Sequence, residues 1–242
     1  MITSKDNGTV RRIRSLKEKK GRQEYGQYLI EGVKQVREAC LAGADVETVI
    51  VSESYKGEIF LPERTEAVTD ILFGKLTDEC APQGILAAVK IPDCAPRAPR
   101  GRCLLLDGIA DPGNLGTIVR TANGAGYKDL YLRGCTDPFS PKCVRSAMSG
   151  LFFVRLHSGT EDALFGALDG VPLIAADMRG ESMVSFTAPE NFCLCIGSEA
   201  NGLSDGVRER CVRTVSVPLA DTCESLNAAV AAGILMYQLI RK

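Results

Sequence analysis

Short apolar segments alternate with amphipathic ones along most of this chain of 242 residues. Short apolar strands that alternate with helices are typical of a mostly parallel sheet with helices on both faces. The second half of the chain therefore predicts an α/β fold over residues 103–242. Its expected strands are "CLLLDGI", "DLYLRG", "VPLIAAD", "FCLCIG" and "TVSVPL", and its expected helices cover 114–126, 140–150, 160–169 and 225–242.

A similar but shorter pattern precedes it. Residues 25–91 contain "YLIEGVKQVREACLAG", a strand entering a helix, then the strand "VETVIVSES", the strand-helix segment "EAVTDILFGKL" and the strand "GILAAVKI". The stretch "IPDCAPRAPRGR" that follows has three prolines, three arginines and no hydrophobic period, as a linker would. We therefore expect a small α/β domain over 25–91, a linker over 92–102 and a second domain over 103–242.

Charge is unevenly distributed along the chain. The net charge of −1 excludes a polyanion-binding character for the molecule as a whole. Residues 1–24, however, contain eight basic and three acidic residues, a net charge of +5. This basic N-terminal arm, with Arg11, Arg12 and Arg14, suits a contact with nucleic acid. On charge alone, a solvated helix start or a frayed tail explains it equally well.

Several classes of protein are disfavoured by composition. The N-terminus is polar and no apolar run approaches the roughly 18 residues that a membrane span needs, so a cytoplasmic protein is expected. The ten cysteines include no C-x-x-C pair, which favours reduced, buried thiols over disulfides or zinc ligands. His157 is the only histidine, so a multi-histidine metal site is excluded, and its place at a strand end indicates a structural role.

Three polar loops follow predicted strands, at 107–114, 197–204 and 218–225. Ligands of parallel sheets bind beyond the carboxyl ends of the strands, so the three loops are expected to open on one edge. Each loop taken alone has a plain structural explanation: a surface turn with a solvated Glu199, or a helix cap at Ser225. Neither G-x-G-x-x-G nor G-x-x-x-x-G-K-[ST] is present, which argues against a nucleotide-dependent dehydrogenase or a P-loop enzyme.

The same loops carry a family resemblance. "DPGNLGTIVRTANGAG", "CIGSEANGLS" and "VSVPLADTCESLNAAVAAGI" resemble, in order and spacing, the three motifs of the SpoU (TrmH-type) RNA 2'-O-ribose methyltransferases of the SPOUT superfamily. One position departs from that pattern, since Ser198 stands where the family often has Asn. More weakly, "LIEGVKQVREACLAG" and "QGILAAV" are similar to the substrate-binding domain that often precedes the catalytic one.

The resemblance implies a fold and a cofactor. It implies a catalytic domain with a deep trefoil knot, S-adenosylmethionine bound by the knot loops, no metal, and a homodimer formed through the C-terminal domain. By position, Gly197, Val217 and Leu226 match the cofactor-binding residues of the family, and Arg145 matches a basic position near the RNA. Its functional polar set corresponds to Asn114, Arg120, Glu199, Ser225 and Asn227.

The reaction implied is methyl transfer to a ribose 2'-hydroxyl of structured RNA. Without a histidine in the loops, we interpret Arg120 as a clamp on phosphate and on the developing alkoxide, because arginine is too basic to serve readily as a base. Glu199 is expected to hold Arg120 or the ribose. The separate N-terminal domain favours large-subunit rRNA as the substrate. Transfer RNA, or a non-catalytic RNA-binding or ribosome-assembly role, remain alternatives.

Overall fold

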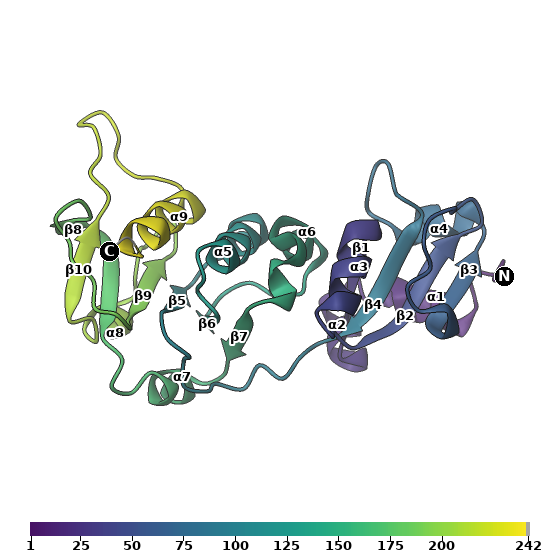
Figure 1. Cartoon of the computed structure of the whole chain (residues 1–242), viewed down its shortest axis with the longest axis horizontal. Coiled ribbons are helices and arrows are strands. Elements are labelled where there is room, and N and C mark those ends of the chain that lie inside the picture. The colour runs from purple at the N-terminus through teal and green to yellow at the C-terminus, as the bar shows by residue number, and fades with distance from the viewer. Residues whose placement is uncertain (241–242) are drawn as a thin grey trace. The chain divides into compact units, whose positions relative to one another are not determined.

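The computed structural model describes residues 1–240, which form two compact units (Figure 1). The first unit comprises Met1–Pro92 together with Phe139–Phe152. The second comprises Asp93–Pro138 and the described residues from Phe153 onward. Both units combine helices with a sheet, so the predicted α/β class is confirmed.

A four-stranded sheet of order β1-β4-β2-β3 organises the first unit. Strand β4 runs antiparallel to both of its neighbours, and β2 runs parallel to β3. The elements of this unit are α1 (Gly8–Ser15), α2 (Lys19–Tyr25), β1 (Gln27–Glu31), α3 (Val33–Leu41), β2 (Val46–Ser52), η1 (Pro62–Arg64), β3 (Thr65–Val68), α4 (Asp70–Leu76), β4 (Ile85–Lys90), α6 (Pro141–Ala147) and η2 (Met148–Phe152).

Residues 1–24 fold into this unit, although the sequence predicts a separate arm there. Helix α1 begins after Asn7, whose side chain accepts hydrogen bonds from the next amides. Its Val10, Ile13 and Leu16 recur every three residues and are at most 2% exposed, within one core shared with β2, β4 and α4. The basic side chains therefore belong to two helices that pack in the first unit. The predicted boundary at residue 24, between an arm and a domain, is wrong.

A second difference concerns residues 139–152, which lie inside the predicted second domain but pack in the first unit. Pro141 opens α6 at its first position, as predicted. Helix α6 buries Val144 and Ala147 and contacts β1, while η2 contacts α3. The ring of Phe139 lies 4.9 Å from that of Tyr28 in β1. Periodicity alone shows that a helix buries a face, but not which sheet receives it.

The second unit contains a six-stranded, all-parallel sheet of order β10-β8-β9-β5-β6-β7. Its elements are β5 (Cys103–Asp107), α5 (Pro112–Gly124), β6 (Asp129–Arg133), β7 (Arg155–Ser158), α7 (Glu161–Ala167), β8 (Leu173–Ser182), β9 (Cys193–Gly197), α8 (Asp205–Arg208), β10 (Arg213–Ser216) and α9 (Ala228–Leu239). Helices α5 and α9 pack against each other, and α9 also contacts β9. The trefoil knot that the resemblance implies stays a prediction.

The predicted linker is not a free connection from residue 93 onward, because it lies along the second unit. The Tyr131 hydroxyl donates to the carbonyl of Arg97 over 2.7 Å, and the amide of Arg100 donates to Asp129 over 2.9 Å. Asp129 is fully buried and also accepts from His157 over 2.8 Å. His157 is 2% exposed and stacks on the Tyr131 ring. The structural role predicted for this histidine agrees with that environment.

Other features of composition have structural counterparts. All ten cysteines are free thiols. Among residues 1–240, no three histidine, cysteine or acidic side chains gather as a metal site would require. No helix in the described part of the chain has the length and apolar character to cross a membrane.

Candidate functional site

The three motif loops leave one edge of the parallel sheet. Strands β5 and β9 are neighbours, with Asp107 paired with Gly197 at their carboxyl ends. Strand β10 ends at Ser216, two positions along in the same parallel sheet from β9. Parallel strands place their carboxyl ends on a common edge, and the predicted convergence of the loops is therefore found.

Asn114 joins the three loops. It lies in the first turn of α5, where its amide donates to the capping carboxylate of Asp111 over 2.9 Å. Its side-chain Nδ2 donates to Oε1 of Glu199 in the second loop. Its Oδ1 accepts from Nδ2 of Asn227, at the end of the third loop, over 3.0 Å. One amide side chain thus fixes the mutual positions of all three motifs.

Asn227, rather than Ser225, caps the last helix. Its Oδ1 accepts from the amides of Ala229 and Val230 over 2.9 and 3.3 Å, so α9 begins at Ala228, three residues later than the sequence predicts. The amide group has two ends. Its oxygen caps the helix while its nitrogen donates to Asn114. Ser225 instead lines the cavity described below.

Arg120 stands apart from this hydrogen-bonded set. It follows Asn114 by six residues, or about 1.7 helical turns, and therefore points in a different direction around α5. Its side chain is exposed and has no hydrogen-bond or ion-pair partner among residues 1–240. Glu199 holds Asn114 and not Arg120, contrary to one of the two predicted contacts of that carboxylate. The guanidinium is left available for an anion from outside the chain.

A cavity of about 450 Å³ lies against the second and third loops. Gly197, Val217 and Leu226, the three positions matched to cofactor binding, all line it, and so do Glu199 and Ser225. The apolar part of its wall contains Ile196, Val215, Val217, Leu219, Leu226, Ala228, Ala231 and Leu235. The size is that of a small-molecule site.

The residues present fit S-adenosylmethionine. An apolar wall suits a flat adenine ring, and charged side chains on the same cavity suit an amino-acid moiety with both charges. These charged residues are Asp177, Arg179, Glu199 and Arg208. When bound, this cofactor would supply a sulfonium methyl group, a strong methyl donor.

The two glycines of the second loop have different roles. Gly202 has φ +65°, the left-handed region that favours glycine. Gly197 does not have positive φ. A Cβ there would lie 2.1 Å from the carbonyl carbon of Gly202 and 2.2 Å from the amide nitrogen of Leu203. The close approach predicted at Gly197 is therefore made by the chain's own backbone, which closes the loop through paired hydrogen bonds between Ser198 and Gly202.

Asp107 and Arg133, at the carboxyl ends of β5 and β6, fix the first two loops. Arg133 donates to Asp107 over 2.7 Å and to Glu161 over 2.6 Å. The second oxygen of Asp107 accepts from the amide of Ser204, the last residue of the second motif, over 2.7 Å. Asp107 is 4% exposed, so this ion pair is largely shielded from water. The loops consequently rest on a rigid polar base.

Three charged residues of the cavity wall, Asp177, Arg179 and Arg208, are not among the site residues predicted from the sequence. Nη1 of Arg208 lies 2.5 Å from Oδ2 of Asp177. Burial raises the pKa of Asp177, but hydrogen bonds from Arg208 and Arg179 outweigh burial and lower this pKa to about 2. A signal was present: Asp177 ends the apolar run "VPLIAAD", as Asp107 ends "CLLLD". The short helix α8, which carries Arg208, has no such pattern.

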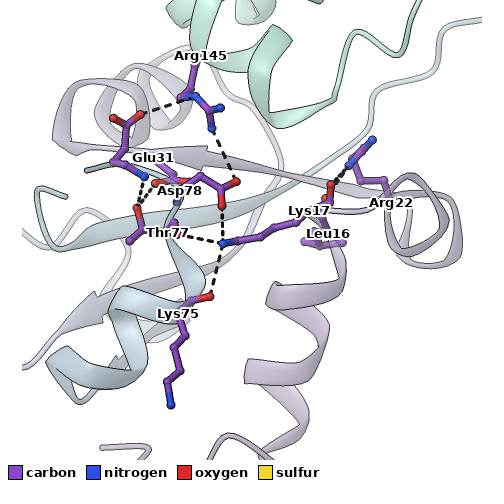
Figure 2. A network of polar contacts seen from close by, with 9 residues as sticks. Leu16, Lys17, Arg22, Glu31, Lys75, Thr77, Asp78 and Arg145 are labelled. Atoms are coloured by element: carbon purple, nitrogen blue, oxygen red, sulfur yellow. Dashed lines mark hydrogen bonds and ion pairs between the residues drawn. The ribbon is translucent and has the colours of Figure 1, made fainter. Parts of the chain in front are cut away.

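The basic residues of the N-terminal segment separate into two groups. Arg11 and Arg14 are exposed. Arg12 donates to Gln27 and to Thr48, each over 2.7 Å, and so has a structural role that the charge count did not predict. Two more are used by the fold (Figure 2): Lys17 pairs with Asp78 over 2.7 Å, and Arg22, 4% exposed, donates to the carbonyls of Leu16 and Lys17.

Arg145 joins the same network from α6. Its guanidinium lies 3.8 Å from Asp78 and 4.0 Å from Glu79, distances too long for tight ion pairs (Figure 2). Asp78 thus lies between Lys17 and Arg145, and its backbone amide donates to Glu31. The side chain of Arg145 is 36% exposed. The contact between Arg145 and RNA remains a prediction. The structure adds that two acidic residues lie near this guanidinium.

The chain matches two known family models. Residues 101–237 match the SpoU rRNA Methylase family, and residues 7–87 match the MRM3-like substrate binding domain. The first model covers all three loops of the site.

Individual proteins are similar over nearly the whole chain. The chain is 32% identical to the 23S rRNA (guanosine(2553)-2'-O)-methyltransferase RlmP of Bacillus subtilis, over 98% of each chain. It is 32% identical to the 23S rRNA (uridine(2479)-2'-O)-methyltransferase of Streptomyces viridochromogenes, over 90% of this chain and 83% of the relative. The crystal structure of the SpoU methyltransferase AviRb from the same organism, in complex with AdoMet, has a TM-score of 0.83 at 28% identity, over 96% and 97% of the two chains.

Proposed function

Because the chain belongs to the SpoU rRNA methylase family, we propose that it transfers a methyl group from S-adenosylmethionine to a ribose 2'-hydroxyl of large-subunit ribosomal RNA. One structural observation carries this proposal: Asn114, Glu199 and Asn227 form a single hydrogen-bonded set beside a cavity of about 450 Å³. Polar groups from three separate motifs meet there, next to a space that fits the cofactor.

The chemical task of these residues is positioning and charge stabilisation. In methyl transfer, the 2'-oxygen attacks the methyl carbon in line, the carbon–sulfur bond breaks, and the hydroxyl proton leaves. Alignment of the two reacting groups supplies much of the rate enhancement. Because hydrogen bonds already fix the loops, little conformational entropy is lost when the two groups are aligned. Asn114 and Glu199 orient the ribose, while the Asp107–Arg133 pair keeps both of their loops in place.

Arg120 supplies the positive charge. Its exposed guanidinium binds an RNA phosphate next to the reacting ribose and stabilises the oxyanion that develops on the 2'-oxygen. This lowers the pKa of the hydroxyl, so that water can take the proton. His157 is buried against Asp129 and offers no base to the loops.

The first unit is proposed to hold the RNA. Two exposed arginines of α1, Arg11 and Arg14, contribute, and Arg145 contributes from α6. A phosphate near Arg145 would exchange the long contacts with Asp78 and Glu79 for a charge-assisted hydrogen bond. Arg12 is left out because its hydrogen bonds are used within the fold.

We expect the double variant Arg11→Gln/Arg14→Gln to bind RNA less tightly and with a shallower dependence on salt. For every phosphate that the variant no longer neutralises, the slope of log affinity against log salt should fall by roughly 0.7 to 0.9. A salt titration of RNA binding measures this slope. Deleting residues 1–24 would not be a clean test, because it removes Val10, Ile13 and Leu16 from the core.

The control is Lys34→Gln/Arg37→Gln, which removes two exposed cations from α3 of the same unit. Equal slopes for the wild type and the Arg11/Arg14 variant would mean that α1 makes no phosphate contacts. S-adenosylmethionine affinity should be the same in all three proteins.

The active form is proposed to be a homodimer built on the C-terminal unit. Helix α9 is apolar through most of its length, yet Val230 is 51% and Tyr237 is 48% exposed. They are seven residues apart and so lie on one face of the helix. Two such faces can cover each other across a twofold axis.

Val230→Glu is expected to shift the protein from dimer to monomer, because it places a charge in an apolar interface. Light scattering coupled to size-exclusion chromatography measures the mass. Val212→Glu is the matched control, since Val212 is 68% exposed elsewhere on the second unit. A dimer that survives Val230→Glu unchanged would remove α9 from the interface.

The decisive test of function is a map of 2'-O-methylation in RNA from a strain lacking the gene. We expect one ribose methyl group to be missing from large-subunit rRNA and to return with the wild-type gene but not with Arg120→Ala. A missing methyl group in tRNA would redirect the proposal to the alternative substrate. An unchanged methylation map would favour a non-catalytic role.

We propose the cytoplasm as the compartment, in keeping with ten free thiols.

A further inference from the structure

The cavity contains one well-held cation that neither the motifs nor the mechanism uses. Arg208 extends from α8, just after the second motif loop, into the cavity wall. The segment that carries it is anchored by Leu203 and Val207, which are 4% and 0% exposed. The start of this helix is fixed by the hydrogen bond from Ser204 to Asp107. The backbone beneath Arg208 is therefore rigid.

Asp177 fixes the side chain. Its Oδ2 accepts from Nη1 of Arg208 over 2.5 Å, while its Oδ1 accepts from the amide of Arg179 over 3.0 Å. Asp177 is 15% exposed and Arg208 is 36% exposed. The pair thus lies at the cavity wall and not in bulk solvent, with the carboxylate largely covered and the guanidinium partly open.

Arg208 has donors left over. A guanidinium carries five N–H donors in a rigid fork and no acceptor. Asp177 accepts from Nη1, and among residues 1–240 no other side chain or carbonyl accepts from the remaining N–H groups of Arg208. Nη2 lies beside the turn of the second loop, where a Cβ on Gly202 would be 3.8 Å away. The remaining donors are partly open to solvent and are free to bind an anionic group of a ligand.

Arg179 cannot fill this role equally well. It shares the cavity wall and also contacts Asp177, with Nε 3.3 Å from Oδ1. Its side chain, however, is 82% exposed, so water surrounds it and weakens any ion pair that it makes. It serves as the natural comparison for Arg208.

We infer that Arg208, held by Asp177, binds the carboxylate of the methionine moiety of S-adenosylmethionine. Of the ionic groups on this ligand, the sulfonium and the ammonium are cations that a guanidinium repels. The carboxylate is the one anionic acceptor. Asp177 balances the charge of Arg208, so the pair accepts the carboxylate without creating a cationic cavity. This inference rests on the proposed function, because it assumes that the cavity holds this cofactor.

The test compares two ligands that differ only at the carboxylate: S-adenosylmethionine and decarboxylated S-adenosylmethionine. Isothermal titration calorimetry on the full-length protein gives the affinity of each. A charge-assisted pair of this kind should give the wild type a preference of about 10- to 100-fold for the carboxylated ligand. In Arg208→Gln the preference should fall to within about threefold, with little change in affinity for the decarboxylated ligand.

Arg179→Gln is the matched control and should keep the wild-type preference. Thermal unfolding monitors the folding of each variant. Should Arg208→Gln fold poorly, Arg208→Lys retains the charge but not the fork, and it should lower the preference at least threefold. An Arg208 variant that keeps the full preference overturns the inference, as does one that weakens both ligands equally. Failure of the proposed function appears differently, as a wild-type protein that binds neither ligand.

Discussion

Arg120→Ala should lower the rate of methyl transfer by roughly 100- to 1,000-fold, the loss typical of a removed oxyanion donor, while S-adenosylmethionine affinity stays unchanged. The physical reason is that Arg120 and the cofactor cavity are separate features of the second unit. Arg120 is exposed on α5 and does not line the cavity, whose wall comes from the second and third loops and from β8, β9, α8, β10 and α9. Single-turnover kinetics and calorimetry measure the two quantities independently.

Two further variants sharpen this prediction. Arg120→Lys should recover little activity, because an ammonium is a point charge and cannot span a phosphate and an alkoxide at once. Thr117→Ala, an exposed change on the same helix, should behave like the wild type. Near wild-type turnover by Arg120→Ala would remove the clamp mechanism. A parallel loss of cofactor affinity would instead indicate a role in building the site.

Gly197→Ala should abolish cofactor binding and destabilise the second unit with a single added methyl group. The new Cβ would meet backbone atoms of Gly202 and Leu203 at 2.1 and 2.2 Å, so the second loop must open. Overpacking of this kind costs about 1–3 kcal/mol of stability. The cavity wall that Gly197 and Gly202 form would be lost with it. Calorimetry with S-adenosylmethionine and thermal unfolding report the two effects.

Gly206→Ala provides the matched control, since a Cβ there meets its nearest neighbour, Glu161, at an ordinary 3.4 Å. It should unfold and bind as the wild type does. Gly197→Val should be worse than Gly197→Ala, because a branched side chain needs more of the same space. Unchanged cofactor affinity in Gly197→Ala would mean that the cofactor does not depend on this loop.

The sequence was sufficient for the parts of the fold that repeat a local rule. Apolar runs predict strands, and polar residues directly after them predict loops on one sheet edge. That logic brings Asn114, Glu199 and Asn227 together before any coordinates are considered. The same logic fails where the position of a helix boundary depends on residues far away in the sequence. The N-cap of α9 shifts from Ser225 to Asn227, whose side chain has a second partner in Asn114, 113 residues earlier.

Charge counting was less informative than hydrophobic patterning. The net charge of residues 1–24 treats all basic side chains as equivalent. In the folded unit, Arg12, Lys17 and Arg22 are tied to neighbouring groups, and the exposed cations are fewer than the count suggests. Whether a cation faces solvent depends on which side of α1 packs, and that follows from the spacing of Val10 and Ile13 rather than from charge.

Relatives of this chain at equal identity are named for different nucleotides. Two relatives at the same 32% identity are named for a guanosine and for a uridine at different positions of 23S rRNA. A site that acts on the ribose touches a group common to all nucleotides. Selection of the nucleotide is therefore expected to come from surfaces outside the motif loops that recognise the shape of the RNA.

The position of residues 139–152 sets an order of events during synthesis. These residues supply α6 and η2 to the first unit, where Phe139 packs on Tyr28, 111 positions earlier in the chain. A nascent chain that ends near residue 92 has made the whole four-stranded sheet but lacks α6, one of the helices that pack on β1. Translation must add some sixty more residues, several seconds at ordinary rates, before that surface is closed. During this interval the apolar surface of β1 that α6 and Phe139 later cover stays open to solvent.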